Sequence, residues 1–162
     1  MTKMSNMTKK RTMGSAKTRK NMTSSKSSTL RNFQREITVY FFEMLLLIKL
    51  YHWKTYSYAT HKATDELYSK FNENMDKFIE VLLGKAGNRI NLLKTSSLKL
   101  KDFNSSVDDM KKFKHEIIKF KEYLVNLNSN PFMVKMSNTD LYNIRDEILA
   151  DLNQFLYLLS FK

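Results

Sequence analysis

The sequence contains no cysteine, one proline and only three glycines among its 162 residues. Without cysteine the chain has no disulfide bonds and no thiolate ligands, so a metal site would need nitrogen and oxygen ligands. The scarcity of proline and glycine leaves few points at which a helix must end. Long apolar runs are missing too, because Glu43 and Lys49 interrupt the richest one, residues 41–53, which is shorter than a membrane span of about 20 residues. With no apolar signal-peptide core at the N-terminus, we expect a soluble intracellular protein that is not secreted and does not enter a membrane.

Acidic residues are absent from the first 28 positions, although the whole chain has 16 of them. This segment is rich in Ser, Thr and Asn, so we expect residues 1–28 to be a disordered basic tail before a folded domain, residues 29–162. Such a tail binds polyphosphates by releasing counterions, and duplex DNA, bound without sequence preference, is the expected partner. The residues expected to contact DNA are Lys3, Lys9, Lys10, Arg11, Lys17, Arg19, Lys20 and Lys26. A solubilising tail and a nuclear address are the alternative interpretations.

The remaining residues predict an all-α fold with four helices. The helices are expected to begin near Leu30, Tyr58, Val107 and Ser137, and the first two to end near Trp53 and Leu83. Apolar residues at helical spacing indicate the buried face of each helix. These stripes are Ile37, Phe41, Met44 and Ile48; Leu67, Phe71, Met75, Phe78 and Leu82; Val107, Met110, Phe113, Ile117, Phe120, Leu124 and Leu127; and Leu141, Ile144, Ile148, Leu152, Phe155 and Leu159.

A long connector is expected between the second and third helices. It runs over residues 84–104, with Gly84 and Gly87 as helix-ending signals and with Leu92-Leu93 as a possible short helix. Four helices with one long crossover predict a ferritin-like four-helix bundle. The first helix also has a second apolar face, which indicates contact with another subunit. That face consists of Phe42, Leu46, Leu50 and Trp53.

Four side chains of metal-ligand type share one face of the second helix. They are His61, Asp65, Asp76 and Glu80, which fall within an arc of roughly 100°. The pairs His61/Asp65 and Asp76/Glu80 are each spaced i,i+4, so each pair can converge on one ion. The first and last of the four lie roughly 28 Å apart along the axis, so one helix cannot close the set around one metal. Two copies that cross antiparallel about a two-fold axis would bring the two pairs together.

Each of these features also has a simpler interpretation. A His–Asp pair is common on exposed helices, and paired acids can form a solvated edge. Tyr68, Ile79 and Leu83 lie among or beside the acids, however, and this apolar content indicates a subunit contact. His52 is either a packed, hydrogen-bonded histidine or a metal ligand. Trp53 is most simply a packing residue.

From residue 50 to residue 84 the sequence resembles the miniferritins, also called DNA-binding proteins from starved cells. The matching motifs are His52-Trp53, His61-Lys62-Ala63-Thr64-Asp65 and Asp76-Lys77-Phe78-Ile79-Glu80. The segment between the histidines is shorter than in the family, and Tyr56-Ser57-Tyr58 replaces its usual Gly-Pro turn. The resemblance implies a site shared between two subunits, with Trp53 as a redox-active aromatic beside it. The implied ligands are His52, His61, Asp65, Asp76 and Glu80.

The donor types also restrict the metal. Imidazole and carboxylate without thiolate suit iron, manganese or zinc, and an open, asymmetric set favours redox iron, in a mono-iron or di-iron site. By the resemblance, the site would oxidise iron(II) with peroxide or oxygen, and a homo-oligomeric shell of twelve subunits would store the ferric mineral. The competing hypothesis is a DNA-compacting or structural ferritin-like assembly with a vestigial or structural metal site. Binding to RNA or to an anionic membrane would rest on charge alone.

Overall fold

All regular structure in the described part of the chain is helical. The computed structural model describes residues 16–95, 97–103, 107–135 and 138–161. Its long helices are α1 (Ala16–Lys54), α2 (Tyr58–Ala86), α3 (Val107–Asn126) and α5 (Thr139–Leu158). A 3-10 turn, η1 (Leu127–Ser129), and the short helix α4 (Pro131–Lys135) lie between α3 and α5. The predicted all-α class is therefore confirmed.

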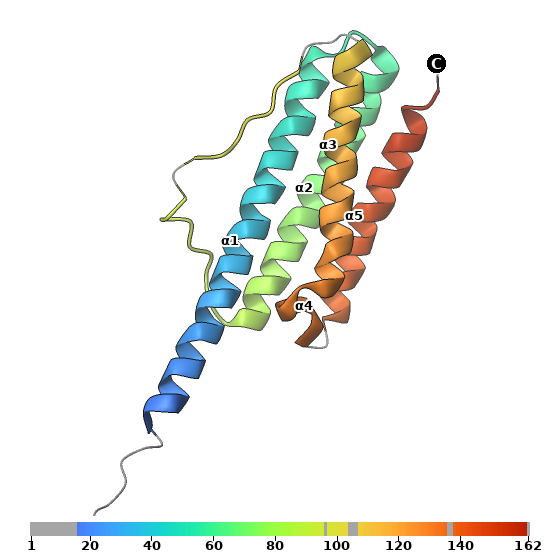
Figure 1. Ribbon diagram of the computed structural model, residues 1–162. Coiled ribbons are helices and arrows are strands. Elements are labelled where there is room, and N and C mark those ends of the chain that lie inside the picture. Colours follow the sequence, from blue (N-terminus) through green and yellow to red (C-terminus); the bar gives the residue numbers. More distant parts are fainter. Residues whose placement is uncertain (1–15, 96, 104–106, 136–137, 162) are drawn as a thin grey trace, which may run out of the picture.

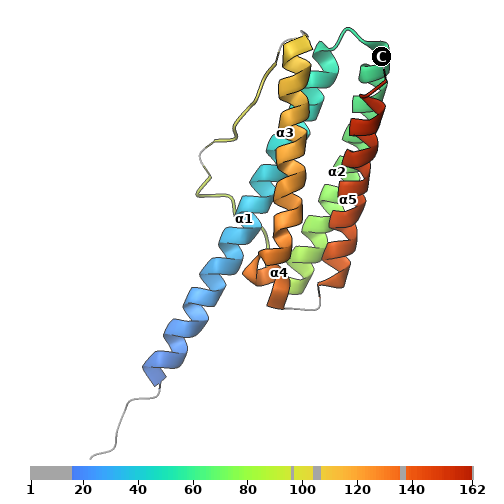
Figure 2. The ribbon, with the colours of Figure 1, turned by 45° about the vertical axis from the view of Figure 1, so that its right-hand side comes forward.

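The four long helices lie side by side (Figures 1 and 2). A connection of three residues, 55–57, joins α1 to α2, so these two helices are antiparallel. The connector after α2 runs back along the outside of α1, and α3 therefore runs in the same direction as α2 while α5 runs in the opposite one. The N-terminal part of α1 extends beyond the other helices.

The core lies between the predicted apolar stripes. Every stripe residue whose side chain is described is buried except Met110, which is partly buried against the same core. Phe41 lies at the centre, where its ring meets those of Phe71, Phe78 and Phe120 edge-on at centroid distances of 5.7, 5.5 and 6.0 Å. Burial of each such ring contributes roughly 1.5–3 kcal/mol, so these contacts fix the mutual positions of α1, α2 and α3.

Helix α2 has identifiable signals at both of its ends. The Ser57 hydroxyl accepts a hydrogen bond from the backbone N–H of Thr60 at 3.3 Å, which caps the first turn at the predicted position. Gly84 remains helical, whereas Gly87 adopts a φ of 63°, a left-handed conformation that favours glycine, and ends the helix. The helix therefore extends three residues past the predicted end at Leu83, to Ala86.

Two predictions of local structure are wrong. Helix α1 begins at Ala16 and not near Leu30, so residues 16–28 are helical instead of disordered. No proline or glycine interrupts the sequence from Ala16 to Lys54, and its Ser-Thr run does not act as a cap. Residues 1–15, which carry the rest of the predicted tail, lie outside the described residues. Leu92 and Leu93 form a turn and not a short helix, and Leu93 is 92% exposed.

Polar contacts hold the connector against α1 and α3. The Lys54 ammonium donates a hydrogen bond to Asp102 at 2.6 Å and thereby lowers the pKa of that carboxyl. Glu43 accepts a hydrogen bond from the backbone N–H of Lys99 at 2.9 Å. Lys101 pairs with Glu116 of α3. The connector is therefore attached to the helices at its second half, close to the α1–α2 turn.

Candidate metal centre

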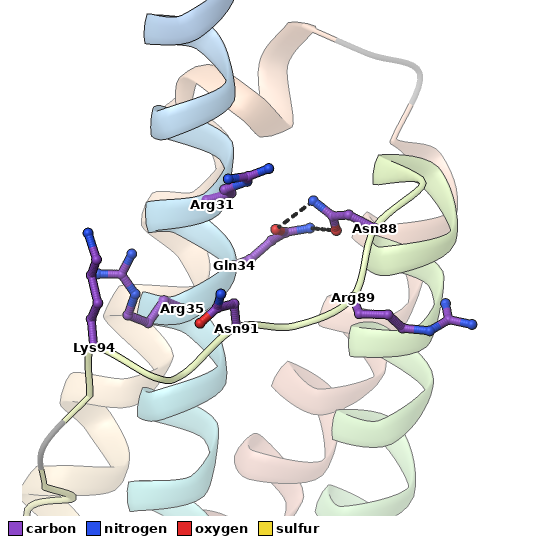
Figure 3. A pocket seen from close by; sticks show the side chains of 7 residues that line it. All are labelled: Arg31, Gln34, Arg35, Asn88, Arg89, Asn91 and Lys94. Carbon is purple, nitrogen blue, oxygen red and sulfur yellow. Dashed lines mark hydrogen bonds between the residues drawn. The ribbon is translucent and has the colours of Figure 1, made fainter.

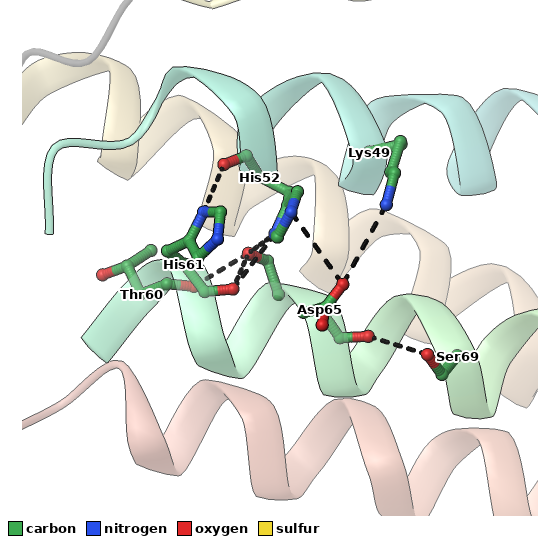
Figure 4. Close-up of polar contacts among 7 residues, drawn as sticks. Lys49, His52, Thr60, His61, Asp65 and Ser69 are labelled. Atoms are coloured by element: carbon green, nitrogen blue, oxygen red, sulfur yellow. Dashed lines mark hydrogen bonds and ion pairs between the residues drawn. The ribbon is translucent and has the colours of Figure 1, made fainter. Parts of the chain in front are cut away.

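The short turn between α1 and α2 brings His52 and His61 into direct contact. His52 lies near the end of α1 and His61 in the first turn of α2, and their rings stack with centroids 3.9 Å apart and planes 24° apart (Figure 4). His52 is 7% exposed and His61 is half-buried. The shortened segment between the two histidines therefore brings them together.

Hydrogen bonds determine which ring nitrogen of each histidine carries the proton. His52 Nδ1 lies 3.1 Å from the backbone oxygen of His61, and His61 Nδ1 lies 3.1 Å from the backbone oxygen of His52. A carbonyl oxygen can only accept, so Nδ1 donates in both rings. The Thr64 hydroxyl, 3.2 Å from His52 Nδ1, supports this assignment because its proton points to the carbonyls of Thr60 and His61. In a neutral ring with this tautomer, Nε2 carries the lone pair with which histidine binds metals.

Asp65 completes a cluster of three ligand-type residues on one chain. Its Oδ1 lies 3.9 Å from His52 Nε2, and the carboxylate is about half exposed. Two ligands bound at about 2.0–2.2 Å to one tetrahedral ion, as found for zinc, lie roughly 3.4 Å apart. The observed separation is longer, so the two side chains would have to approach one another to hold one ion. The stacked histidine rings present their in-plane lone pairs in nearly parallel planes, so a shared ion would require His61 to turn.

Lys49 occupies the approach to this carboxylate. Its Nζ lies 4.0 Å from Asp65 Oδ1 (Figure 4). The same atom lies 4.5 Å from the centre of the Tyr68 ring and 5.8 Å from that of Trp53. The ammonium thus supplies one positive charge next to Asp65 and makes cation–π contacts with two aromatic rings. A metal ion at Asp65 would have to displace or repel this ammonium.

The other predicted acids, Asp76 and Glu80, do not join the cluster. Both are exposed on the far part of α2, and no described side chain forms a hydrogen bond or ion pair with either. Within the described residues, no group of three or more His, Cys, Asp or Glu side chains is arranged to hold a metal ion. A site that uses Asp76 and Glu80 together with the histidines would therefore need a second copy of the chain, which stays a prediction.

The surface beside the cluster is apolar and largely uncovered in the single chain. Trp53 is 67% exposed, so it does not pack within the bundle, and Phe42 on the same side of α1 is 36% exposed. Ile79 and Leu83 of α2 are only half-buried. The four-residue face of α1 and the ligand face of α2 are thus available for contact with a second molecule.

Sequence reasoning missed two residues that shape this centre, Lys49 and Thr64. Lys49 lies three residues before His52 on α1, a spacing that puts both on one helix face, and this signal was available. Thr64 is completely buried and donates within its own helix, and only the close approach of α1 reveals its role. Of the predicted DNA contacts, Lys17, Arg19, Lys20 and Lys26 lie on the helical backbone of α1, and the other four lie outside the described residues.

No helix in the described ranges combines the length and apolarity that crossing a membrane requires.

Comparisons with known proteins identify a family but no activity. Neither a curated protein nor a solved structure matches the sequence significantly. One family model, described as a family of unknown function (DUF5856), matches residues 52–159, about two thirds of the chain. The matched region includes His52, His61, Asp65, Asp76 and Glu80 and excludes the basic tail. The chain therefore belongs to the family of unknown function DUF5856.

Proposed function

We propose that this protein is a miniferritin-like iron(II)-oxidising protein with a ferritin-like four-helix bundle. Two copies would share each site: one supplies His52, His61 and Asp65, and the other supplies Asp76 and Glu80. A shell of such dimers would store the ferric product, and the basic N-terminal segments would hold duplex DNA. The observation that carries this proposal is the contact between the two histidine rings, both of which use Nδ1 for a backbone carbonyl, with His52 Nε2 3.9 Å from the Asp65 carboxylate.

The arrangement of the long helices supports the same proposal. The connector from α2 to α3 crosses the length of the bundle, so α2 and α3 run in the same direction, the connectivity of ferritin-like bundles with one long crossover. The apolar residues beside the ligand face favour an antiparallel contact between two α2 helices. In that contact, Asp76 and Glu80 of the second copy would lie against the histidine pair of the first.

The residues of the chain would have separate roles in the reaction. His52 and His61 bind the substrate iron(II) through Nε2, and the backbone carbonyls that accept from Nδ1–H orient both rings. The carboxylates neutralise charge and favour the ferric product over iron(II). Two iron(II) ions give up one electron each to one peroxide, which takes up two protons and leaves as two waters. Trp53 is exposed, with its ring 5.8 Å from the Lys49 ammonium beside Asp65, and is the aromatic proposed to give one electron to the peroxide oxidant.

A complementation experiment tests the shared site. One variant carries His61→Ala and Asp65→Ala, and the other carries Asp76→Ala and Glu80→Ala. Each alone should assemble but oxidise iron(II) no faster than buffer, because every site lacks two ligands. After co-refolding, half of the dimers are mixed and each of these has one complete site of two, so activity should return to roughly a quarter of the parent value.

The control for complementation removes two acids that lie off the ligand face. Glu36 of α1 and Glu122 of α3 are exposed and form no hydrogen bond or ion pair among the described residues, and the variant Glu36→Ala/Glu122→Ala should retain the parent rate. A co-refolded assembly that forms normally but stays inactive would refute the shared site.

A non-enzymatic DNA-compacting assembly is the second candidate function. The ammonium of Lys49 favours it, because a positive charge 4.0 Å from the Asp65 carboxylate would repel a metal ion there. The same experiment separates the two candidates, since a purely structural assembly would show no iron(II) oxidation above buffer even with the parent sequence.

A further inference from the structure

A cavity of about 380 Å³ lies at the opposite end of the α1–α2 pair, between α1 and the first part of the connector. Its lining residues are Arg31, Gln34, Arg35, Asn88, Arg89, Asn91 and Lys94. Four of these are cations, three are neutral amides, and none is an acid. Pockets of this size hold small ligands or single charged groups.

Two of the polar groups that line this cavity are buried, the Gln34 amide and the Nε atom of Arg35. Gln34 is 2% exposed, and its side-chain amide exchanges two hydrogen bonds with that of Asn88, at 2.9 and 3.3 Å (Figure 3). This pair holds the start of the connector against α1. The Nε atom of Arg35 is buried and has no hydrogen-bond partner among the described residues. Because an unmet buried donor is unfavourable, the guanidinium would gain from an acceptor in the cavity.

The cations around the cavity come from both elements. Arg35 and Lys94 extend in the same direction beside Asn91, Arg31 extends above Gln34, and Arg89 points away from the others (Figure 3). No described acid forms an ion pair with Arg31 or Lys94, and the one described partner of the Arg35 guanidinium is the neutral Asn32, at 3.1 Å. Like charges that gather without a counter-charge repel one another, and a bound anion relieves that repulsion.

We propose that this cavity binds a phosphate group, with Arg31, Arg35 and Lys94 as charge donors and the amides of Asn88 and Asn91 as additional donors. The fork of a guanidinium matches the tetrahedral oxygens of phosphate, and the amides add neutral hydrogen bonds. The phosphate is either a phosphodiester of duplex DNA or part of a free polyphosphate. The site lies between α1 and the start of the connector and is independent of the iron chemistry, so it goes beyond the binding proposed for the basic tail.

The test compares variants of equal charge in the full-length protein. Arg31→Gln/Lys94→Gln removes two exposed cations of the cavity, and Lys62→Gln/Lys121→Gln removes two cations that lie elsewhere and have no described partner. Affinities for a 24-base-pair duplex and for inorganic tripolyphosphate are measured at several salt concentrations. We expect the cavity variant to lose about tenfold more affinity than the control variant for at least one probe, with a salt dependence smaller by roughly 0.9 per lost phosphate contact.

A charge-conserving substitution separates a built site from general attraction. Arg35→Lys keeps the positive charge but removes the fork and the buried Nε, so a phosphate site should weaken several-fold whereas a diffuse cationic surface should not respond. Loss for DNA alone assigns the site to the phosphodiester backbone, loss for tripolyphosphate alone assigns it to a free polyphosphate, and loss for both allows either. If the cavity variants match the control for both probes, the proposed phosphate site is refuted.

Discussion

The two ends of the α1–α2 pair carry opposite chemistry. At the turn between the helices, two imidazole lone pairs and a carboxylate provide places for a cation. About 27 Å away along α1, the cavity beside Gln34 gathers cations and amides without an acid, which suits an anion. The core between the two ends is apolar and continuous. One pair of antiparallel helices thus carries two polar clusters of opposite character, separated by packed apolar side chains.

The largest expected effect comes from deleting the basic residues at the N-terminus of the chain. Residues 1–15 and residues 16–28 each contain four basic side chains and no acid. The salt dependence is the slope of the logarithm of the DNA-binding constant against the logarithm of the salt concentration, and each neutralised phosphate adds about 0.9 to its magnitude. Deleting the first segment should remove about half of the tail's contribution to this slope. Deleting both should lower its magnitude by up to about 7. Titrations of a labelled duplex at several salt concentrations measure both slopes.

Assembly and iron(II) oxidation serve as controls for these truncations. Both should persist, because the first buried core residue of α1 is Phe33, which neither truncation removes. DNA affinity that stays the same after both truncations, at every salt concentration, would contradict the role of the tail.

A smaller effect is expected at the opposite end, where Lys49 competes with a metal ion for Asp65. At a separation of 4.0 Å, the charge–charge energy is about 1 kcal/mol in water and more where solvent is excluded. Lys49→Gln should therefore raise the affinity for zinc(II), used as a redox-inactive probe, by at least about fivefold. Lys54→Gln is the matched control, because Lys54 pairs with Asp102 and not with Asp65. Equal zinc(II) affinities in the parent, variant and control would show that the charge of Lys49 does not weaken metal binding at Asp65.

The smallest effect is expected between the two ends. The Tyr123 hydroxyl is buried without a hydrogen-bond partner in the described residues, and burial raises the pKa of this phenol far above its ordinary 10.0. Tyr123→Phe should stabilise the protein at pH 7 by up to about 1 kcal/mol, since it removes an unmet polar group. Denaturant unfolding at pH 7 and above pH 10 measures this change.

The expected pH dependence of this variant follows from the raised pKa. The folded state favours the protonated phenol, so its contribution to stability is complete below pH 10 and is lost as the pH rises toward the folded-state pKa. The advantage of Tyr123→Phe should therefore grow in alkali, while metal and phosphate binding at the two ends stay unchanged. Lower stability of the variant at pH 7 would show that the hydroxyl has a partner.

Helical periodicity predicted the middle of the molecule better than its ends. The stripes through Phe41, Phe78 and Phe120 were predicted from spacing alone, because burial imposes a repeat on the sequence. The contact between His52 and His61 depends on the geometry of the turn 55–57, for which no repeat exists. The phosphate cavity depends on the path of the connector, which brings residue 34 next to residue 88. Contacts between segments far apart in sequence leave no local signal.

The start of α1 was mispredicted for a different reason. Ser and Thr at positions 27–29 are frequent helix caps, yet they also tolerate helix interiors at a small cost per residue. Without a proline or glycine to stop it, the helix continues through them to Ala16. Apolar spacing could not reveal this extension, because Ala16 and Met22 are the only apolar residues in the sequence from 16 to 28.

The unbroken course of α1 sets a length scale for any contact with a duplex. From Ala16 to Arg31 the helix axis spans about 23 Å. Successive phosphates on one DNA strand are about 3.4 Å apart, so this distance corresponds to about seven nucleotides. A helical rod holds its two ends at constant separation, whereas a disordered chain samples many. A duplex lying along this helix would therefore contact its two ends at phosphates a constant distance apart. An oligonucleotide shorter than about seven nucleotides could contact only one of these ends at a time.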